Sequence, residues 1–146
     1  MTDTQTTYPP LAGFAAHLGL EIVDWTEAGP VLALEVAPHH LNRNGAVHGG
    51  VLLSMLDSVC SLAGVRLVEG RLTGRVVAVQ LSTNFVAPAT GGRLTGRARI
   101  RGGGTKMLHV EGEVVDAAGA TVAMATGVVR RIRDTQAGEP RTGDDA

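Results

Sequence analysis

Cysteine, aromatic residues and long hydrophobic runs are all scarce in this chain of 146 residues. Cys60 is the only cysteine, which excludes an intrachain disulfide and a thiolate metal cluster and fits a reducing compartment. Aromatic residues make up 3% of the chain, so aliphatic side chains must fill the core. No apolar stretch approaches the roughly 18 residues that cross a bilayer, and no basic patch followed by an apolar run opens the chain. We therefore expect a cytoplasmic protein without a membrane span or a secretion signal.

An excess of charge of one sign is also missing, because 13 Lys and Arg residues stand against 14 Asp and Glu residues. The net charge of −1 provides no general basic field, so we expect neither nucleic acid nor a membrane surface as a partner. Hydrophobic residues make up 44% of the chain, which is typical of a packed globular core. The polar residues 1–10 and the Gly/Pro/acid-rich residues 134–146 are expected to be flexible tails around a single domain of residues 11–133.

Hydrophobic periodicity predicts a short helix at residues 11–20, ended by Gly19, and a long helix at residues 50–68. Alternating or β-branched runs between turn signals predict the strands, at residues 21–26, 31–37, 76–86, 93–101, 106–116 and 121–132. Short turns between successive strands favour antiparallel pairing. A helix that is apolar nearly all round needs a sheet to cover it. We therefore predict an α+β fold, with an antiparallel sheet of about five or six strands wrapped around one long central helix.

The long helix carries a single narrow polar stripe, because Ser54, Asp57, Ser58 and Ser61 follow each other at helical spacing. An ionised carboxylate without a partner on a buried helix would cost several kcal/mol. Asp57 is therefore a candidate base or nucleophile. The structural alternative is a carboxylate bonded to serine hydroxyls or to amides of a partner chain, which would only set the helix register.

Two glycines, Gly49 and Gly50, stand where a loop enters this helix. The first N–H groups of a helix have no intrahelical acceptor, and the helix dipole favours negative charge there, so an oxyanion or a polarised carbonyl oxygen is a suitable ligand. Gly49 and Asp57 are about 12 Å apart at a rise of 1.5 Å per residue, so one chain cannot bring both to the same carbonyl carbon. Two copies with antiparallel helices would place Gly49 of one near Asp57 of the other, a geometry that the sequence suggests without requiring it.

The sequence resembles a known family in three places: the run Asn42-Arg43-Asn44-Gly45-Ala46-Val47-His48-Gly49-Gly50 followed by Asp57, the segment Phe85-Val86-Ala87-Pro88, and the segment Gly119-Ala120-Thr121-Val122-Ala123. These residues resemble the hot-dog-fold acyl-CoA thioesterases of the phenylacetate-pathway (PaaI-like) group. The resemblance covers roughly residues 11–132, and its pattern N-x5-HGG-x6-D is fairly specific. It implies a hot-dog fold, a homodimer that often pairs again into a homotetramer, and hydrolysis of small or medium acyl-CoA thioesters without a metal or other cofactor.

Site roles follow from the resemblance position by position. Gly49 would donate its N–H to the thioester carbonyl, and His48 would help to shape that loop. Asp57 of the partner subunit would act as the nucleophile or as a general base toward water. Asn42 would help to hold the water or the thioester, and Ser61 would stand near the carboxylate. Some relatives carry a water-contacting Ser on the strand after the helix, where this chain has Ala78, so Gln80 or Ser61 would have to substitute.

The phosphates of coenzyme A (CoA) need cations or free N–H groups. The candidates for binding the substrate or its CoA part are Gly50, Gln80, Arg101, Gly104, Thr105, Lys106, Arg130 and Arg131. Arginines on the strand at residues 93–101 are explained equally well as a solvated face that pairs with Glu111 and Glu113 across strands.

Other interpretations remain open at this point. A non-catalytic acyl-CoA-binding regulatory protein would use the same pocket, and a hydratase acting on enoyl-CoA is a third possibility. Cys60 is interpreted as a core residue. His39, His40 and His48 lack the acidic ligands and the spacing of a metal site. Aromatic, branched and straight-chain acyl groups remain alternatives, and so do thioesters of CoA and of an acyl carrier protein.

Overall fold

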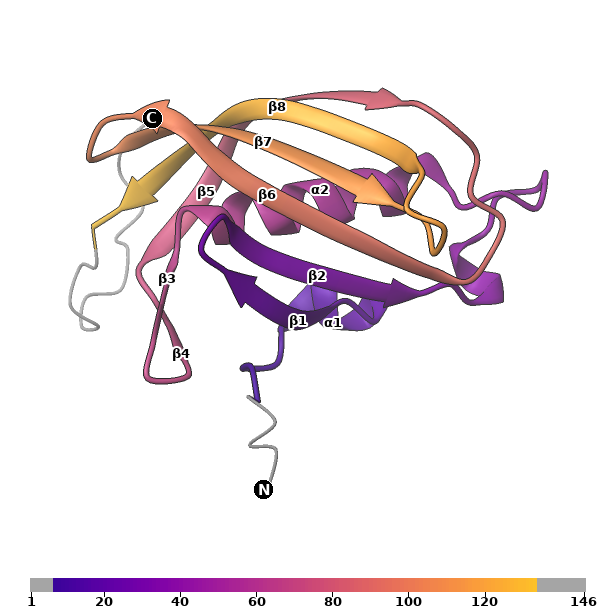
Figure 1. Cartoon of the computed structure of the whole chain (residues 1–146), viewed down its shortest axis with the longest axis horizontal. Helices are drawn as coiled ribbons and strands as arrows, with labels where there is room; N and C mark the ends of the chain where they lie inside the picture. Colours follow the sequence, from indigo (N-terminus) through magenta and orange to yellow (C-terminus); the bar gives the residue numbers. More distant parts are fainter. Residues whose placement is uncertain (1–6, 134–146) are drawn as a thin grey trace, which may run out of the picture.

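A six-stranded antiparallel sheet curls around one long helix, α2 (Gly49–Ala63), in the computed structural model of the chain, which describes residues 7–133 (Figure 1). The strands lie in the order β1-β2-β6-β7-β8-β5. Their bounds are β1 Glu21–Thr26, β2 Gly29–Glu35, β5 Arg75–Phe85, β6 Arg93–Gly103, β7 Met107–Val115 and β8 Thr121–Ile132. The predicted α+β class and the sheet of about five or six strands around one central helix are confirmed.

The order of the strands leaves β1 and β5 at the two edges of the sheet. Strands β6, β7 and β8 pair antiparallel in succession, as predicted from the short turns between them, whereas β5 pairs with β8 and not with β6, the next strand in the sequence. The chain passes through α2 between β2 and β5, and this crossing places β5 beside β8 at the far edge (Figure 1). The helix contacts β2, β5, β6, β7 and β8 and so fills the concave side of the sheet.

Buried and exposed side chains alternate along the strands, so one face of the sheet packs against α2 and the other faces solvent. On β7, Leu108, Val110 and Val114 are buried toward α2, and the charged residues between them face the other way. The helix lies close to the sheet because Gly112 has no side chain: a Cβ atom there would be 2.7 Å from the Sγ atom of Cys60. The low aromatic content is thus matched by an aliphatic core, packed around Met55 and its neighbours.

The long helix ends at Ala63, five residues before the predicted end at residue 68, so this boundary was wrong. Residues beyond Gly64 instead form a hairpin of β3 (Arg66–Val68) and β4 (Arg71–Thr73), which the periodicity did not predict. The apolar residues of β3 continue the helical spacing by coincidence, and the turn at Glu69 and Gly70, both with positive φ, ends that pattern. Among residues 7–133, no helix is both long and apolar enough to cross a membrane.

At the N-terminal side, the short helix α1 (Gly13–Leu18) ends at Gly19 as predicted, where φ is 82°. A single turn, η1 (Pro38–His40), follows β2. Tyr8, which lies in the predicted N-terminal tail, forms hydrogen bonds with Asp24 and Trp25 of β1. The predicted tail at residues 134–146 and residues 1–6 of the other tail lie outside the described residues.

Candidate active site

His48 is the residue immediately before α2, and its side chain caps the helix. The His48 Nδ1 atom accepts a 2.9 Å hydrogen bond from the Gly50 N–H, so the ring carries its proton on Nε2. The His48 N–H donates to the His40 carbonyl oxygen at 2.8 Å. His40 is buried, and its own ring bridges the Ala37 N–H and the Leu18 carbonyl oxygen. A pair of histidines therefore sets the path of the loop into the helix.

Gly49 keeps its backbone N–H free at this helix start. No residue among 7–133 accepts a hydrogen bond from it, whereas the Gly50 N–H is already bonded to His48. The Phe85 ring lies against Gly49, because a Cβ atom on Gly49 would be 3.2 Å from the ring. Of the two glycines singled out by the sequence, Gly49 is the one able to donate to a carbonyl oxygen or an oxyanion, at the positive end of the helix dipole.

Asn42 stands in a tight turn that leads into this loop. Its Oδ1 atom accepts hydrogen bonds from the N–H groups of Asn44 at 2.8 Å and Ala46 at 3.2 Å, and its N–H donates to the Ala46 carbonyl oxygen at 2.7 Å. The side-chain oxygen is thus occupied in holding the turn. The Nδ2 group is the part of Asn42 that remains for a water or a substrate oxygen.

Asp57 lies in a hollow of about 440 Å³ between α2 and the edge strand β5. The hollow is lined by Phe14 of α1, by Leu53, Ser54, Asp57 and Ser58 of α2, and by residues 78–81 of β5. The Ser54 hydroxyl is used within the helix, where it donates to the Gly50 carbonyl oxygen at 2.7 Å. Within the described part of the chain, no group donates a hydrogen bond to the Asp57 carboxylate or pairs with it. The carboxylate is therefore available to a ligand.

Partial burial in this hollow raises the pKa of the Asp57 carboxyl above its ordinary value of 3.8. The side chain is nevertheless exposed in a single chain, and so is its neighbour Leu53 at 41%. The polar stripe of the predicted central helix therefore lies on an exposed side of α2 in a single chain. One curled sheet covers one side of α2, and the side that carries the polar stripe stays open.

The sheet brings Ala78 and Gln80, the two β5 positions considered for contact with water, to the Asp57 hollow. Gln80 also lines a second hollow on the sheet, beside Arg101 and His109. Ser61 does not line the Asp57 hollow. The apolar lining was missed at Phe14 and Leu53, because the sequence pattern of an amphipathic helix does not reveal which apolar side chains remain uncovered.

Gly49 and Asp57 remain apart in one chain. They are separated by eight residues of the same α-helix, which is about 12 Å. Gly49 does not line the hollow around Asp57. A single chain therefore holds both predicted halves of the site without bringing them together.

The candidate CoA-binding cations Lys106, Arg130 and Arg131 lie near the C-terminal end of α2, whereas Gly50 is at its start and Gln80 at the Asp57 hollow. The Arg131 N–H donates to the Lys106 carbonyl oxygen at 2.8 Å, and the Arg131 Nε donates to the Gly64 carbonyl oxygen at 3.0 Å. Arg130 lies opposite Met107 in the β7–β8 register. Gly104 closes the turn between β6 and β7, which also carries Thr105. Arg101 differs from these cations, because its Nε is 3.3 Å from the Glu111 carboxylate.

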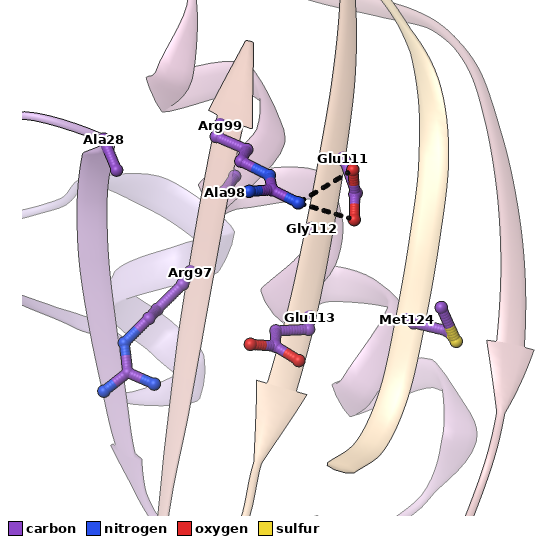
Figure 2. A pocket seen from close by; sticks show the side chains of 8 residues that line it. All are labelled: Ala28, Arg97, Ala98, Arg99, Glu111, Gly112, Glu113 and Met124. Carbon is purple, nitrogen blue, oxygen red and sulfur yellow. Dashed lines mark hydrogen bonds and ion pairs between the residues drawn. The ribbon is translucent and has the colours of Figure 1, made fainter. Parts of the chain in front are cut away.

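A further hollow, of about 330 Å³, crosses β6, β7 and β8 (Figure 2). Its charged residues alternate with residues that are buried toward α2, so they lie on the opposite face of the sheet. Arg99 reaches Glu111 at 3.3 Å, and Arg97 lies opposite Glu113 in the register. The interpretation of paired charges is confirmed for Arg99 and Arg101 with Glu111. This hollow offers no unpaired carboxylate beside a helix, so we place the candidate chemistry at Asp57.

Burial, and secondarily the Asp57 charge, raise the pKa of the Cys60 thiol to about 12. A thiol that stays protonated at neutral pH is a poor nucleophile, which supports the interpretation of Cys60 as a core residue. Among residues 7–133, no three or more His, Cys, Asp or Glu side chains are grouped so as to hold a metal ion.

Comparison with known proteins identifies the family. Residues 44–123 match the family model described as Thioesterase superfamily. A Mycobacterium tuberculosis protein named "Putative esterase" is 34% identical over 86 residues, which is 58% of this chain and 61% of that protein. The chain thus spans about three fifths of the length of the first curated relatives that it matches.

Two solved structures share the fold and part of the sequence. A Ralstonia eutropha protein, titled a "putative thioesterase, phenylacetic acid degradation-related protein", is 33% identical with a TM-score of 0.71, over 84% of this chain and 92% of that one. The PaaI protein from the phenylacetic acid degradation operon of E. coli is 28% identical with a TM-score of 0.71, over 82% of this chain and 83% of that one.

Proposed function

Because this chain belongs to the thioesterase superfamily, we propose that it hydrolyses acyl-CoA thioesters to a free acid and CoA, at a site that two copies of the chain build together. The observation that carries this proposal is the placement of two free groups on one helix. Within the part of the chain that the structure describes, Gly49 offers an N–H without an acceptor, and Asp57 offers a carboxylate without a partner. Hydrolysis of a thioester needs both kinds of group at one carbonyl.

The proposed reaction begins when the thioester carbonyl oxygen accepts a hydrogen bond from the Gly49 N–H. As a general base, Asp57 of the other copy takes a proton from water while the water oxygen attacks the carbonyl carbon. The Gly49 N–H and the positive end of the α2 dipole hold the oxyanion that forms. When the carbon–sulfur bond breaks, Asp57 returns its proton to the CoA sulfur. As a nucleophile, Asp57 would instead attack the carbon directly and form an anhydride that water then opens.

The edge strand β5 supports the pairing of two copies. It is 11 residues long, and apolar side chains on it are more than half exposed, among them Val79 at 55% and Phe85 at 57%. A long apolar edge strand is a surface on which another chain pairs. It runs beside the open face of α2, so a second copy on this side would cover Leu53 and approach Asp57. We propose a homodimer of this kind, which would pair again into a homotetramer.

The anionic part of the substrate would bind at the C-terminal end of α2. Lys106, Arg130 and Arg131 meet there, and the turn at Gly104 and Thr105 exposes backbone beside them. Arg101 is a weaker candidate, because Glu111 already balances its charge. We give Gly50 no direct role, because His48 uses its N–H.

A non-catalytic acyl-CoA-binding protein is the second candidate function, since it would use the same hollow. The free Asp57 carboxylate favours hydrolysis, because a binding protein has no use for an unpaired base beside the thioester. The titles of the two solved structures refer to phenylacetic acid degradation, so phenylacetyl-CoA and hydroxybenzoyl-CoA belong in a substrate panel beside straight-chain C4 to C16 acyl-CoAs.

The test is thiol release from this panel, read with a thiol-reactive chromophore. The chain should release CoA from at least one ester, and Asp57→Asn should reduce kcat by about 10²–10⁴-fold while the dimer remains. Full turnover by Asp57→Asn would end the proposed mechanism. Saturable binding of acyl-CoA without thiol release would favour the binding-protein function instead.

A further inference from the structure

The end of the molecule beyond the C-terminus of α2 is strongly cationic, although the whole chain has a net charge of −1. Three segments meet there, at residues 64–75, 102–107 and 129–133. They contain the cations Arg66, Arg71, Arg75, Lys106, Arg130, Arg131 and Arg133. Glu69 is the only acidic residue in these three segments. The balance of charge in the composition therefore hides a local excess of positive charge.

Backbone pairing places these segments together. Arg75 lies opposite Ile132 in the β5–β8 register, so it stands between Arg131 and Arg133 of the neighbouring strand. Arg131 in turn bonds to the turn at Lys106 and to the end of α2 at Gly64. Two residues beyond Gly64 the hairpin begins with Arg66, which pairs with Thr73 just before β5. Figure 1 shows the hairpin projecting from the body beside the first residues of β5 and the end of β8.

Among residues 7–133, the hairpin arginines have no anionic partner. The ion pairs in the described part of the chain join Arg93 to Glu35, and Arg99 and Arg101 to Glu111. Arg66, Arg71 and Arg75 are all exposed and take part in none of them. Clustered cations repel each other, and an anion with several charged oxygens would relieve that repulsion.

The distance from this end to the Asp57 hollow suits a CoA ester. Strand β5 runs from Arg75 to Ala78, which lines the hollow, over about 10 Å at 3.3 Å per residue. Helix α2 covers a similar distance, about 10 Å, from Asp57 to Gly64. The pantetheine arm of CoA is long enough to reach from a thioester at Asp57 to phosphates at this end.

We propose that Arg66 and Arg71 of the β3–β4 hairpin, together with Arg75, bind the phosphates of the CoA nucleotide and thereby select CoA esters over thioesters that lack it. The inference rests on the proposed thioester hydrolysis. It assigns a function to the hairpin that the sequence periodicity missed. Guanidinium groups suit this role because they bind phosphate oxygens in a bidentate manner.

The experiment compares one acyl group on two carriers, CoA and N-acetylcysteamine, the second of which has no phosphate. In Arg66→Gln/Arg71→Gln, KM for the CoA ester should rise about tenfold or more, with kcat unchanged. KM for the N-acetylcysteamine ester should stay as in the natural chain. The matched control, Arg93→Gln/Arg97→Gln, removes the same formal charge from the sheet surface and should change neither KM.

Binding of adenosine 3′,5′-bisphosphate, measured by calorimetry, tests the phosphate site without turnover. The natural chain and the control should bind it, and Arg66→Gln/Arg71→Gln should bind it about tenfold more weakly or not at all. Equal binding by all three proteins, or an equal rise in KM on both carriers, would overturn the proposal. If only an acyl carrier protein thioester is hydrolysed and the bisphosphate does not bind, the assignment to the CoA nucleotide is wrong. Failure of the proposed hydrolysis would look different, because no carrier would release thiol while the bisphosphate could still bind.

Discussion

The two edge strands of the sheet, β1 and β5, differ in how far their unpaired backbone groups are protected from pairing with another chain. Strand β1 has six residues and carries Glu21 and Asp24, with an irregular register between Ile22 and Asp24. The Tyr8 hydroxyl accepts a hydrogen bond from the Trp25 N–H at 3.2 Å and donates to Asp24 at 3.1 Å. Short length, charge, a bulge and a covering segment are the usual ways in which proteins close an edge strand. The β1 edge is thus protected by residues of the same chain.

Strand β5 is longer, with 11 residues, and shares with β1 only an irregular register, between Ala78 and Gln80. Arg75 at its start is its only charged residue, and its apolar side chains lie open beside the hollow that holds Asp57. The exposed edge strand β5 and the candidate catalytic Asp57 therefore lie on the same side of the molecule. An exposed apolar edge strand promotes aggregation. Burial of this strand by a second copy of the chain, which would also complete the site, explains its apolar character.

Breaking the β5 edge is expected to have the largest effect. Val79→Lys places a charge in the middle of the proposed interface, so we expect a monomer with at least about 10²-fold lower kcat/KM, because Asp57 then loses the Gly49 of its partner. Glu21→Lys changes an exposed side chain on β1 and should leave both mass and activity unchanged. Light scattering coupled to size exclusion gives the mass, and thiol release gives the activity. An active Val79→Lys monomer would contradict the shared site.

Mixing two inactive variants sharpens the same comparison. Gly49→Val drives a side chain into the Phe85 ring and removes the approach to the N–H, and Asp57→Asn removes the base. Random pairing of equal amounts makes half of the dimers mixed, and each mixed dimer holds one intact site of two. Activity should therefore recover to about a quarter of that of the natural chain.

The control for this mixing experiment is the double variant Gly49→Val/Asp57→Asn combined with Asp57→Asn. That mixture contains no intact site and should remain inactive. If the first mixture also stays inactive although mixed dimers form, Gly49 and Asp57 act within one chain.

Changes at the β1 edge are expected to lower the stability of the protein without changing its activity. Tyr8→Phe removes the hydroxyl that joins the N-terminal segment to β1, so the free energy of unfolding should fall by about 1 kcal/mol with unchanged kcat/KM. Ser82→Ala on β5 removes an exposed hydroxyl and serves as the matched control, with a change below about 0.5 kcal/mol. Urea unfolding measures both. A loss of activity in Tyr8→Phe would show that β1 also supports the site.

The smallest effect concerns proton binding at Asp57. Its pKa is raised by burial, so the folded chain binds this proton more tightly than the unfolded chain, and rising pH through the folded pKa lowers stability. Asn does not ionise, so Asp57→Asn should be slightly more stable at pH 7, and the gain should vanish below pH 3.8. The comparison is made in a Val77→Lys background, which charges the β5 edge outside the Asp57 hollow. The ionised form is the active one, so the acid limb of kcat/KM should also lie above 3.8. Greater stability of the Asp57 form at pH 7 would contradict this assignment.

Much of the fold could be predicted from the sequence because its signals are local. The turn before Gly49, the alternation on β6 to β8 and the positive-φ Gly19 each depend on a few neighbouring residues. The end of α2 was predicted wrongly because Val65 and Leu67 continue the helical spacing. Leu67 instead belongs to β3, which forms through pairing with β4. Pairing between separate segments leaves no periodic trace.

The candidate site divides in the same way. Its residue types and spacing, from Asn42 to Asp57, are readable from the chain, and so is the conclusion that one helix keeps Gly49 and Asp57 too far apart. Only the tertiary structure decided that the polar stripe faces outward and that β5 is the exposed edge strand. It also decided that His48 accepts a hydrogen bond from the Gly50 N–H, which leaves the Gly49 N–H available to a ligand. Those features depend on which elements cover each other, and coverage is settled by packing between residues that are distant in the sequence.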